Sequence, residues 1–126
     1  NAAGEAALLA SLTDADALLA KVKLIVDERE RMNALLEKLP GVTPWPSGGN
    51  YILCQFGTGR ATPIFEGLMK RGIFVRKFSH ERLADFFRIT VGPPEQTDAV
   101  IEGIKSAART GTIGDGKIFV SDINAI

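Results

Sequence analysis

The fold is decided by the stretch Leu39-Pro-Gly-Val-Thr-Pro-Trp-Pro-Ser-Gly-Gly-Asn-Tyr-Ile-Leu-Cys-Gln-Phe56, where a helical pattern gives way to a strand pattern. Pro40-Gly41 ends the preceding helix, because proline cannot continue a helix and glycine favours its end. Val42 to Trp45 is then a predicted short strand, and Pro46 to Gly49 a turn. Asn50 to Phe56 is rich in strand-forming residues. The sequence therefore predicts a helix followed directly by two strands.

Two helices are predicted before this stretch. Residues 2–10 are rich in alanine and leucine and predict a short helix, and Thr13 is a candidate N-cap for the next one. Asp14 to Lys38 predicts one long amphipathic helix. Arg29 to Arg31 are interpreted as a solvated face. The apolar residues of the long helix recur at helical spacing: Leu18, Leu19, Val22, Ile25, Val26, Met32, Leu35, Leu36 and Leu39.

The rest of the chain predicts an α+β domain. Thr62-Pro63 is a candidate N-cap with proline at the first helical position, and Gly72 closes that helix at Met69 or Arg71. The further expected elements are a strand Ile73 to Phe78, a loop His80 to Asp85, a strand Phe86 to Val91, a helix Glu95 to Ala108 and a strand Lys117 to Ser121. The order α-α-β-β-α-β-β-α-β over residues 1–126 predicts one domain, a two-layer sandwich with an added C-terminal strand.

Composition narrows the class of protein. With 45% hydrophobic and 24% charged residues, the chain is typical of a soluble globular protein. Its net charge of zero argues against nucleic acid or an anionic membrane as the main partner. No apolar run approaches the ~20 residues that span a bilayer, and no secretory signal is evident. The single Cys54 indicates a buried thiol in a cytoplasmic protein, and with the single His80 it cannot make a zinc site.

Four motifs carry a resemblance over residues 1 to about 104. They are Leu39-Pro-Gly-Val42, Pro46-Ser-Gly-Gly-Asn50-Tyr51, Leu68-Met-Lys-Arg-Gly72-Ile73-Phe-Val-Arg76 and Phe87-Arg88-Ile-Thr-Val-Gly92. In order and spacing they resemble the C-terminal small domain of histidinol-phosphate aminotransferase, a pyridoxal-phosphate enzyme of fold type I. The resemblance implies ferredoxin-like βαβ elements.

The same resemblance implies a substrate site. The arginine matching Arg88 grips the substrate carboxylate, and the one matching Arg76 contacts the anionic end of the substrate. A planar guanidinium pairs bidentately with such groups. Without the family resemblance, Arg88 is interpreted either as one member of a structural ion pair or as a residue that faces outward from the sheet. Arg76 and Lys77 are equally readable as solvated edge residues that block strand addition.

The cofactor residues of that family are not matched here. Its chemistry needs a Schiff-base lysine and an acid on the pyridine nitrogen, and these lie on a large domain N-terminal to the matched region. Lys21, Lys23 and Lys70 do not fit the family's lysine motif. We therefore expect no cofactor and no transaminase activity from this chain alone.

A second resemblance begins where the first ends. Thr110-Gly-Thr-Ile-Gly-Asp-Gly-Lys-Ile-Phe-Val-Ser-Asp-Ile123 resembles the C-terminal signature of the nitrogen-regulatory PII signal proteins. In that family the turn cradles ATP phosphates, which implies roles for the backbone of Gly114, Asp115 and Gly116, the Lys117 ammonium and Arg109. The alternative is a tight helix-to-strand connection.

Three hypotheses for function follow. The first is a non-catalytic recombinant or remnant domain, joined within the helix Glu95 to Ala108. The second is a phosphate- or nucleotide-binding module that uses the glycine turn. The third is a fragment that supplies Arg76 and Arg88 to an aminotransferase. An exposed apolar strand or the long helix would also allow a homodimer.

Overall fold

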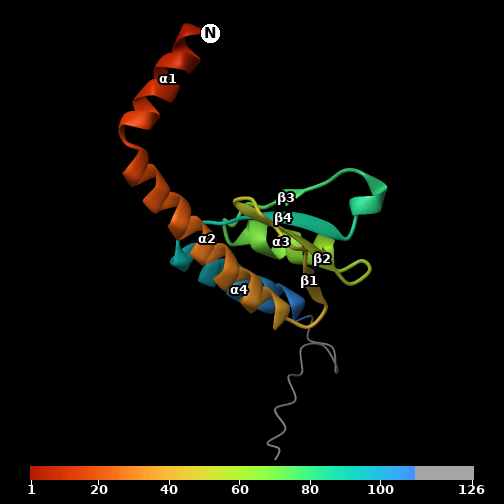
Figure 1. The fold of residues 1–126 in the computed structure, drawn as a ribbon. Coiled ribbons are helices and arrows are strands. Elements are labelled where there is room, and N and C mark those ends of the chain that lie inside the picture. Colours follow the sequence, from red (N-terminus) through yellow and green to blue (C-terminus); the bar gives the residue numbers. More distant parts are fainter. Residues whose placement is uncertain (110–126) are drawn as a thin grey trace, which may run out of the picture.

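The computed structural model describes residues 1–109 (Figure 1). Their element order is the expected one, with a short 3₁₀ helix added before the last strand. The elements are α1 (Ala2–Thr13), α2 (Ala15–Glu37), β1 (Val42–Pro44), β2 (Tyr51–Phe56), α3 (Ala61–Lys70), β3 (Arg76–Lys77), η1 (Glu81–Leu83), β4 (Phe86–Thr90) and α4 (Pro94–Ala108). Within this range no helix is both long and apolar enough to cross a membrane.

The four strands form one antiparallel sheet in the order β1-β2-β4-β3. Strands β2 and β3 both run antiparallel to β4, so they run in the same direction on either side of it. Together with α3 they make a βαβ unit that β4 splits, in agreement with the expected ferredoxin-like elements. Strand β3 covers only Arg76–Lys77, so the predicted strand Ile73 to Phe78 is too long.

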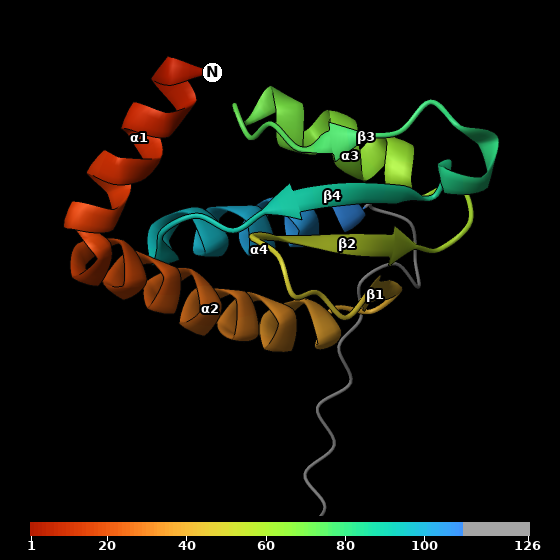
Figure 2. The ribbon, with the colours of Figure 1, turned by 45° about the horizontal axis from the view of Figure 1, so that its top comes forward.

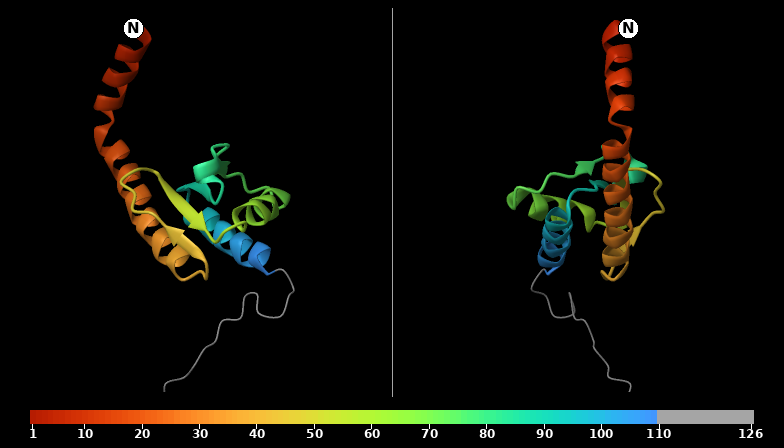
Figure 3. Two further views of the ribbon diagram at one scale, coloured as in Figure 1. Left: turned by 90° about the vertical axis from the view of Figure 1, so that its right-hand side faces the viewer. Right: turned by 60° about the vertical axis from the view of Figure 1, so that its left-hand side comes forward.

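One face of the sheet carries the core. Figures 2 and 3 show α2 and α4 lying together along this side of the sheet. Alternate residues of β2 and β4 turn towards the helices, and the Phe56 and Phe87 rings stack with centroids 4.1 Å apart. Full burial of such a side chain stabilises the fold by about 1.5–3 kcal/mol. The result is a two-layer α+β sandwich, as expected.

Glycine decides how closely α3 and α4 approach. A Cβ built on Gly103 would lie 2.6 Å from the Cδ2 atom of the buried Leu68. Gly72 adopts a φ of +74°, and the Ile73 amide donates to the Leu68 carbonyl at 3.0 Å. This left-handed closure confirms the predicted end of α3.

Two predicted helix caps are wrong. Thr13 lies in the last turn of α1, where its hydroxyl donates to the Ala10 carbonyl at 2.7 Å, and Asp14 holds the N-cap position of α2. Thr62 lies inside α3, which begins one residue earlier after Arg60. The Thr62 hydroxyl instead accepts a hydrogen bond from the Lys77 ammonium at 2.6 Å.

The basic residues in the middle of α2 were predicted to form a solvated face, but the structure shows that Arg29 and Arg31 contact other parts of the fold. The Arg29 side chain is 13% exposed and donates to the Gly49 carbonyl at 3.0 Å. Arg31 pairs with Asp98 and with the buried Glu28, each at 2.9 Å. The hydrogen bond from Arg31 holds the pKa of Glu28 below its usual value of 4.5. These contacts fasten α2 to the turn before β2 and to the start of α4.

The predicted apolar face of α2 is buried over only half its length. Met32, Leu36 and the following Leu39 enter the core. In contrast, Leu19 and Val22 are 64% and 53% exposed, and α1 has no buried residue. The reason is geometric, because α2 continues past the end of the sheet and carries α1 away from it (Figures 1 and 3).

The remaining predictions of structure concern the end of the chain. The predicted strand Lys117 to Ser121 and the glycine turn before it lie outside residues 1–109. The helix in which the two resemblances meet is continuous from Pro94 to Ala108 and buries Val100, Ile101 and Ile104.

Candidate functional site

The second face of the sheet is covered by no helix of residues 1–109. Strand alternation turns Tyr51 and Leu53 of β2 and Arg88 of β4 onto this face, opposite the core side chains. The register places Arg76 of β3 directly beside Arg88. We call this surface the open face. It brings together the two arginines that the sequence singled out.

Arg88 lies on the open face above an aromatic ring. Its guanidinium carbon is 4.8 Å from the centroid of the Tyr51 ring, a cation–π contact. The Arg88 Nε atom is buried and finds no hydrogen-bond acceptor within residues 1–109. Within residues 1–109 no ion pair joins Arg88 to an acid.

The pairing of Arg76 with Arg88 is electrostatically unfavourable. Like charges directly opposite each other on neighbouring strands destabilise a sheet. Arg76 is exposed, and its guanidinium lies 5.9 Å from the Phe78 ring. An anion between the two guanidinium groups would relieve the repulsion and would accept hydrogen bonds from their N–H groups. The arrangement is therefore chemically suited to hold a carboxylate or phosphate.

Aromatic side chains that the sequence reading did not select complete the open face. The rings of Trp45 and Phe86 meet edge to face, with centroids 6.2 Å apart, and Trp45 and Tyr51 are 48% and 39% exposed. The alternation of β2 and β4 could have placed Tyr51 and Phe86 beside Arg88. The position of Trp45 depends on the hydrogen bond from its amide to the Leu53 carbonyl, at 2.8 Å.

Lys77 adjoins Arg76 but turns to the other side. Its ammonium donates to Thr62 and lies 5.6 Å from the Phe65 ring, both on α3. The other lysines of residues 1–109 lie in helices, except Lys38, which directly follows α2 and lines a cavity on the helix side of the sheet. The part of the chain that the structure describes thus turns arginines but no lysine amine onto the open face.

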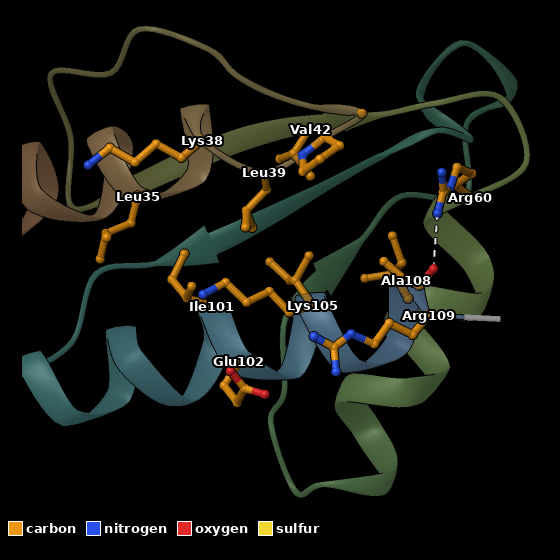
Figure 4. Close-up of a pocket in the computed structure, with 14 residues that line it drawn as sticks. Leu35, Lys38, Leu39, Val42, Arg60, Ile101, Glu102, Lys105, Ala108 and Arg109 are labelled. Carbon is orange, nitrogen blue, oxygen red and sulfur yellow. Dashed lines mark hydrogen bonds between the residues drawn. The ribbon is translucent and has the colours of Figure 1, made fainter. Parts of the chain in front are cut away.

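A separate cavity of about 370 Å³ lies on the helix side of the sheet (Figure 4). It is lined mainly by apolar side chains of α4 and of the segment from Leu35 to Val42, with Lys105 and Arg109 among its cations. Arg60 donates to the Ala108 carbonyl at 3.2 Å beside it. The structure therefore places Arg109 at this cavity and apart from Arg76 and Arg88. Gly114, Asp115, Gly116 and Lys117 lie outside the described residues.

The thiol of Cys54 belongs to the core. Cys54 is fully buried, and this burial raises the pKa of its thiol to about 12. The prediction of a buried structural thiol is confirmed. Among residues 1–109 no three histidine, cysteine or acidic residues gather as a metal site would need.

These features define an α+β module whose open face carries paired arginines. Residues 1–104 match the family described as aminotransferase class I and II. The chain belongs to this family.

Known relatives agree with this assignment. The chain is 44% identical over 111 residues to histidinol-phosphate aminotransferase of Roseiflexus castenholzii, which covers 86% of this chain and 30% of that protein. It is 38% identical over 104 residues to the chloroplastic histidinol-phosphate aminotransferase 1 of Arabidopsis thaliana, covering 82% of this chain and 25% of that protein. The chain thus spans less than a third of the length of these relatives.

Solved structures share the fold. Histidinol-phosphate aminotransferase from Sinorhizobium meliloti, in complex with pyridoxal-5'-phosphate, superposes with a TM-score of 0.68 at 29% identity, over 79% of this chain and 29% of that one. The enzyme from Clostridium acetobutylicum has a TM-score of 0.67 at 18% identity, over 75% of this chain and 29% of that one. The aminotransferase resemblance is confirmed, whereas the resemblance of residues 107–123 to PII proteins stays a prediction.

Proposed function

We propose that this chain is part of a pyridoxal-phosphate-dependent histidinol-phosphate aminotransferase, in which its open face holds the anionic groups of the substrate. Arg88 would grip a carboxylate and Arg76 the other anionic end. The relatives named above support the choice of enzyme. One structural observation supports the choice of role: two arginines pair across β3 and β4 with no acidic partner in residues 1–109.

The open face suits this role physically. The Tyr51 ring restricts the Arg88 guanidinium without using its N–H donors. A restricted guanidinium loses less side-chain entropy when an anion binds, so more of the interaction energy appears as affinity. The buried, unpartnered Nε of Arg88 adds a donor whose hydrogen bond an anion would restore.

The chemistry of amino-group transfer belongs to the cofactor. When bound, pyridoxal phosphate stabilises the carbanion formed at the substrate carbon. The described residues do not fit the cofactor itself, because Lys77 turns to Thr62 and no other strand lysine is present among them. In this proposal the lysine and the acid that hold the cofactor belong to a further part of the enzyme. That part corresponds to the portion of the longer relatives that this chain does not match. The 126 residues alone then bind anions without turning substrate over.

A phosphate titration of the 126-residue chain, followed by amide NMR, tests the role. We expect saturable shifts at Tyr51, Arg76 and Arg88, with a dissociation constant on the order of 1 mM. Arg88→Met removes the guanidinium group but keeps an apolar side chain of similar length, and it should abolish these shifts. The matched control is Arg82→Gln, which removes an exposed arginine of η1. Equal responses of wild type and Arg88→Met would reject the proposed role.

Turnover gives an independent check. The chain mixed with pyridoxal phosphate, glutamate and a keto acid should form no new amino acid above the rate of the cofactor alone. Sustained turnover that Arg88→Met removes would show that the 126 residues are catalytic, contrary to the proposal.

A further inference from the structure

The cavity on the helix side of the sheet lies near the ends of α2 and α4 (Figure 4). Ile101, Lys105 and Ala108 recur at helical spacing, so one face of α4 forms a wall of it. Leu35 and Leu39 line it from the end of α2 and the residues that follow. Its volume of about 370 Å³ falls within the range of small-molecule sites, about 300–1,000 Å³.

The packing of α4 explains why this space remains between the helices. Gly67 and Gly103 let the second half of α4 approach α3 closely, and a Cβ built on Gly67 would lie 2.6 Å from the Cβ of Ala107. The start of α4 is instead tied to α2, because Arg31 donates to the Pro94 carbonyl at 2.9 Å. Thus α2 holds one end of α4 and α3 holds the other, which leaves α2 and α4 apart at the cavity.

Cations gather at the cavity although the chain as a whole has no net charge. Lys105 and Arg109 lie four residues apart at the end of α4, and both side chains are exposed. Figure 4 shows both extending back along α4, whereas the Glu102 carboxylate is directed away from the Lys105 ammonium. Lys38 and Arg60 bring the lining to four cations and one acid. Neither lysine forms an ion pair within residues 1–109.

Two simpler explanations account for less of this arrangement. Cations near a helix C-terminus complement the helix dipole, but the dipole does not require an apolar hollow beside them. Imperfect packing would explain a hollow, but protein interiors leave few voids larger than a water molecule, and a packing defect would not gather cations at its margin. Apolar walls with a few charged groups are instead typical of a small-molecule site.

We propose that the cavity binds a small amphipathic carboxylate, with its aliphatic body between α2 and α4 and its carboxylate at Lys105 and Arg109. The cations at the margin favour an anion, and a guanidinium pairs especially well with a carboxylate. The apolar walls favour an aliphatic body, which inorganic anions lack. The bound molecule would join the two helices at the end that lacks an ion pair such as Arg31 makes with Asp98. This site goes beyond the proposed function, because it lies across the sheet from Arg88.

Octanoate is the probe for this site, added to the 126-residue chain and followed by amide and methyl NMR. We expect saturable shifts centred on Leu35, Ile101 and Ala108, with a dissociation constant on the order of 0.1–1 mM. Acetate offers only the carboxylate and octanol only the aliphatic body, so each should bind at least about tenfold more weakly. Absence of saturable octanoate shifts, or equal binding of octanol, would overturn the proposal.

Two variants test the two parts of the site. Lys105→Gln removes an exposed cation from the margin and should weaken octanoate binding by about fivefold or more. Ala108→Leu fills the hollow from a half-buried position and should abolish binding. The matched control is Lys70→Gln, an exposed cation in the last turn of α3 that does not line the cavity. Equal weakening by Lys70→Gln and Lys105→Gln would contradict the proposed carboxylate site.

A further variant separates this inference from the proposed function. Arg88→Met should bind octanoate like wild type while losing the response to phosphate. A wild type that responds to octanoate but not to phosphate would reject the substrate role alone, and the reverse would reject the cavity site alone. Nuclear Overhauser contacts of Ile101 with residues 110–126, without a response to octanoate, would overturn the proposal in favour of those residues as the occupant.

Discussion

The two faces of the sheet come from the same strands and serve different purposes. On the covered face Ile52 and Phe87 are at most 1% exposed and pack against helices. On the open face their immediate neighbours Tyr51 and Arg88 remain accessible, and Arg88 faces another arginine. One face thus stabilises the fold, whereas the other carries an unfavourable charge pair, which the proposed substrate role would use. Substitutions on the covered face should therefore lower the stability of the fold, whereas substitutions on the open face should change anion binding and leave the stability nearly unchanged.

The largest effect on stability is expected from Phe87→Ala. Phe87 is fully buried and stacks on Phe56, so its removal leaves a cavity in the centre of the core. The free energy of unfolding should fall by about 3–5 kcal/mol, measured by urea denaturation. A loss below about 1 kcal/mol would mean that the covered face does not stabilise the fold as described.

A smaller, pH-dependent effect is expected from Glu28→Gln, which weakens the fastening of α2. Arg31 lowers the pKa of Glu28 below 4.5, so the ionised carboxylate stabilises the folded state above that pH. Wild type should exceed the variant by about 1 kcal/mol at pH 7. This advantage should vanish as the pH falls through the lowered pKa of the folded state. Glu102→Gln, an exposed change on α4, is the control and should match wild type at neutral pH.

On the open face, Arg88→Met should barely change stability. The substitution removes a repulsive neighbour of Arg76 and keeps the apolar stem, so we expect a difference within about 0.5 kcal/mol. Thermal denaturation beside the phosphate titration measures both properties of one sample. A large loss of stability would show that Arg88 belongs to the fold rather than to the site.

The smallest expected signal is the reactivity of Cys54. A thiol with a pKa of about 12 and no exposed surface offers almost no thiolate at pH 8. A thiol reagent should modify it only at the rate of unfolding, and at once in denaturant. Rapid modification of the native chain would show that the covered face opens readily.

Local patterns were sufficient for most elements of the fold. The helix ends at Pro40-Gly41 and Gly72 could be predicted because proline and glycine restrict the backbone directly. The caps at Thr13 and Thr62 could not, since several residues near a helix start can accept the same amide. Periodicity also marked Leu19 as apolar without indicating whether the core of this chain covers it.

The site was only partly predictable for a similar reason. The family motif selected Arg76 and Arg88, but their pairing depends on the register between β3 and β4, which side-chain alternation does not determine. Tyr51 and Trp45 were missed as site residues because aromatic residues in strands are equally common in cores. The contact between Arg29 and Gly49 joins positions twenty residues apart, and no local sequence pattern predicts it.

The two short outer strands limit how the sheet can grow. Strand β3 offers two residues with cationic side chains, and β1 offers three and ends on Pro44, which has no amide hydrogen. Another strand added at either margin would gain only a few ladder hydrogen bonds. The module should therefore resist fibril formation even at the high concentrations used for NMR, despite its exposed leucines.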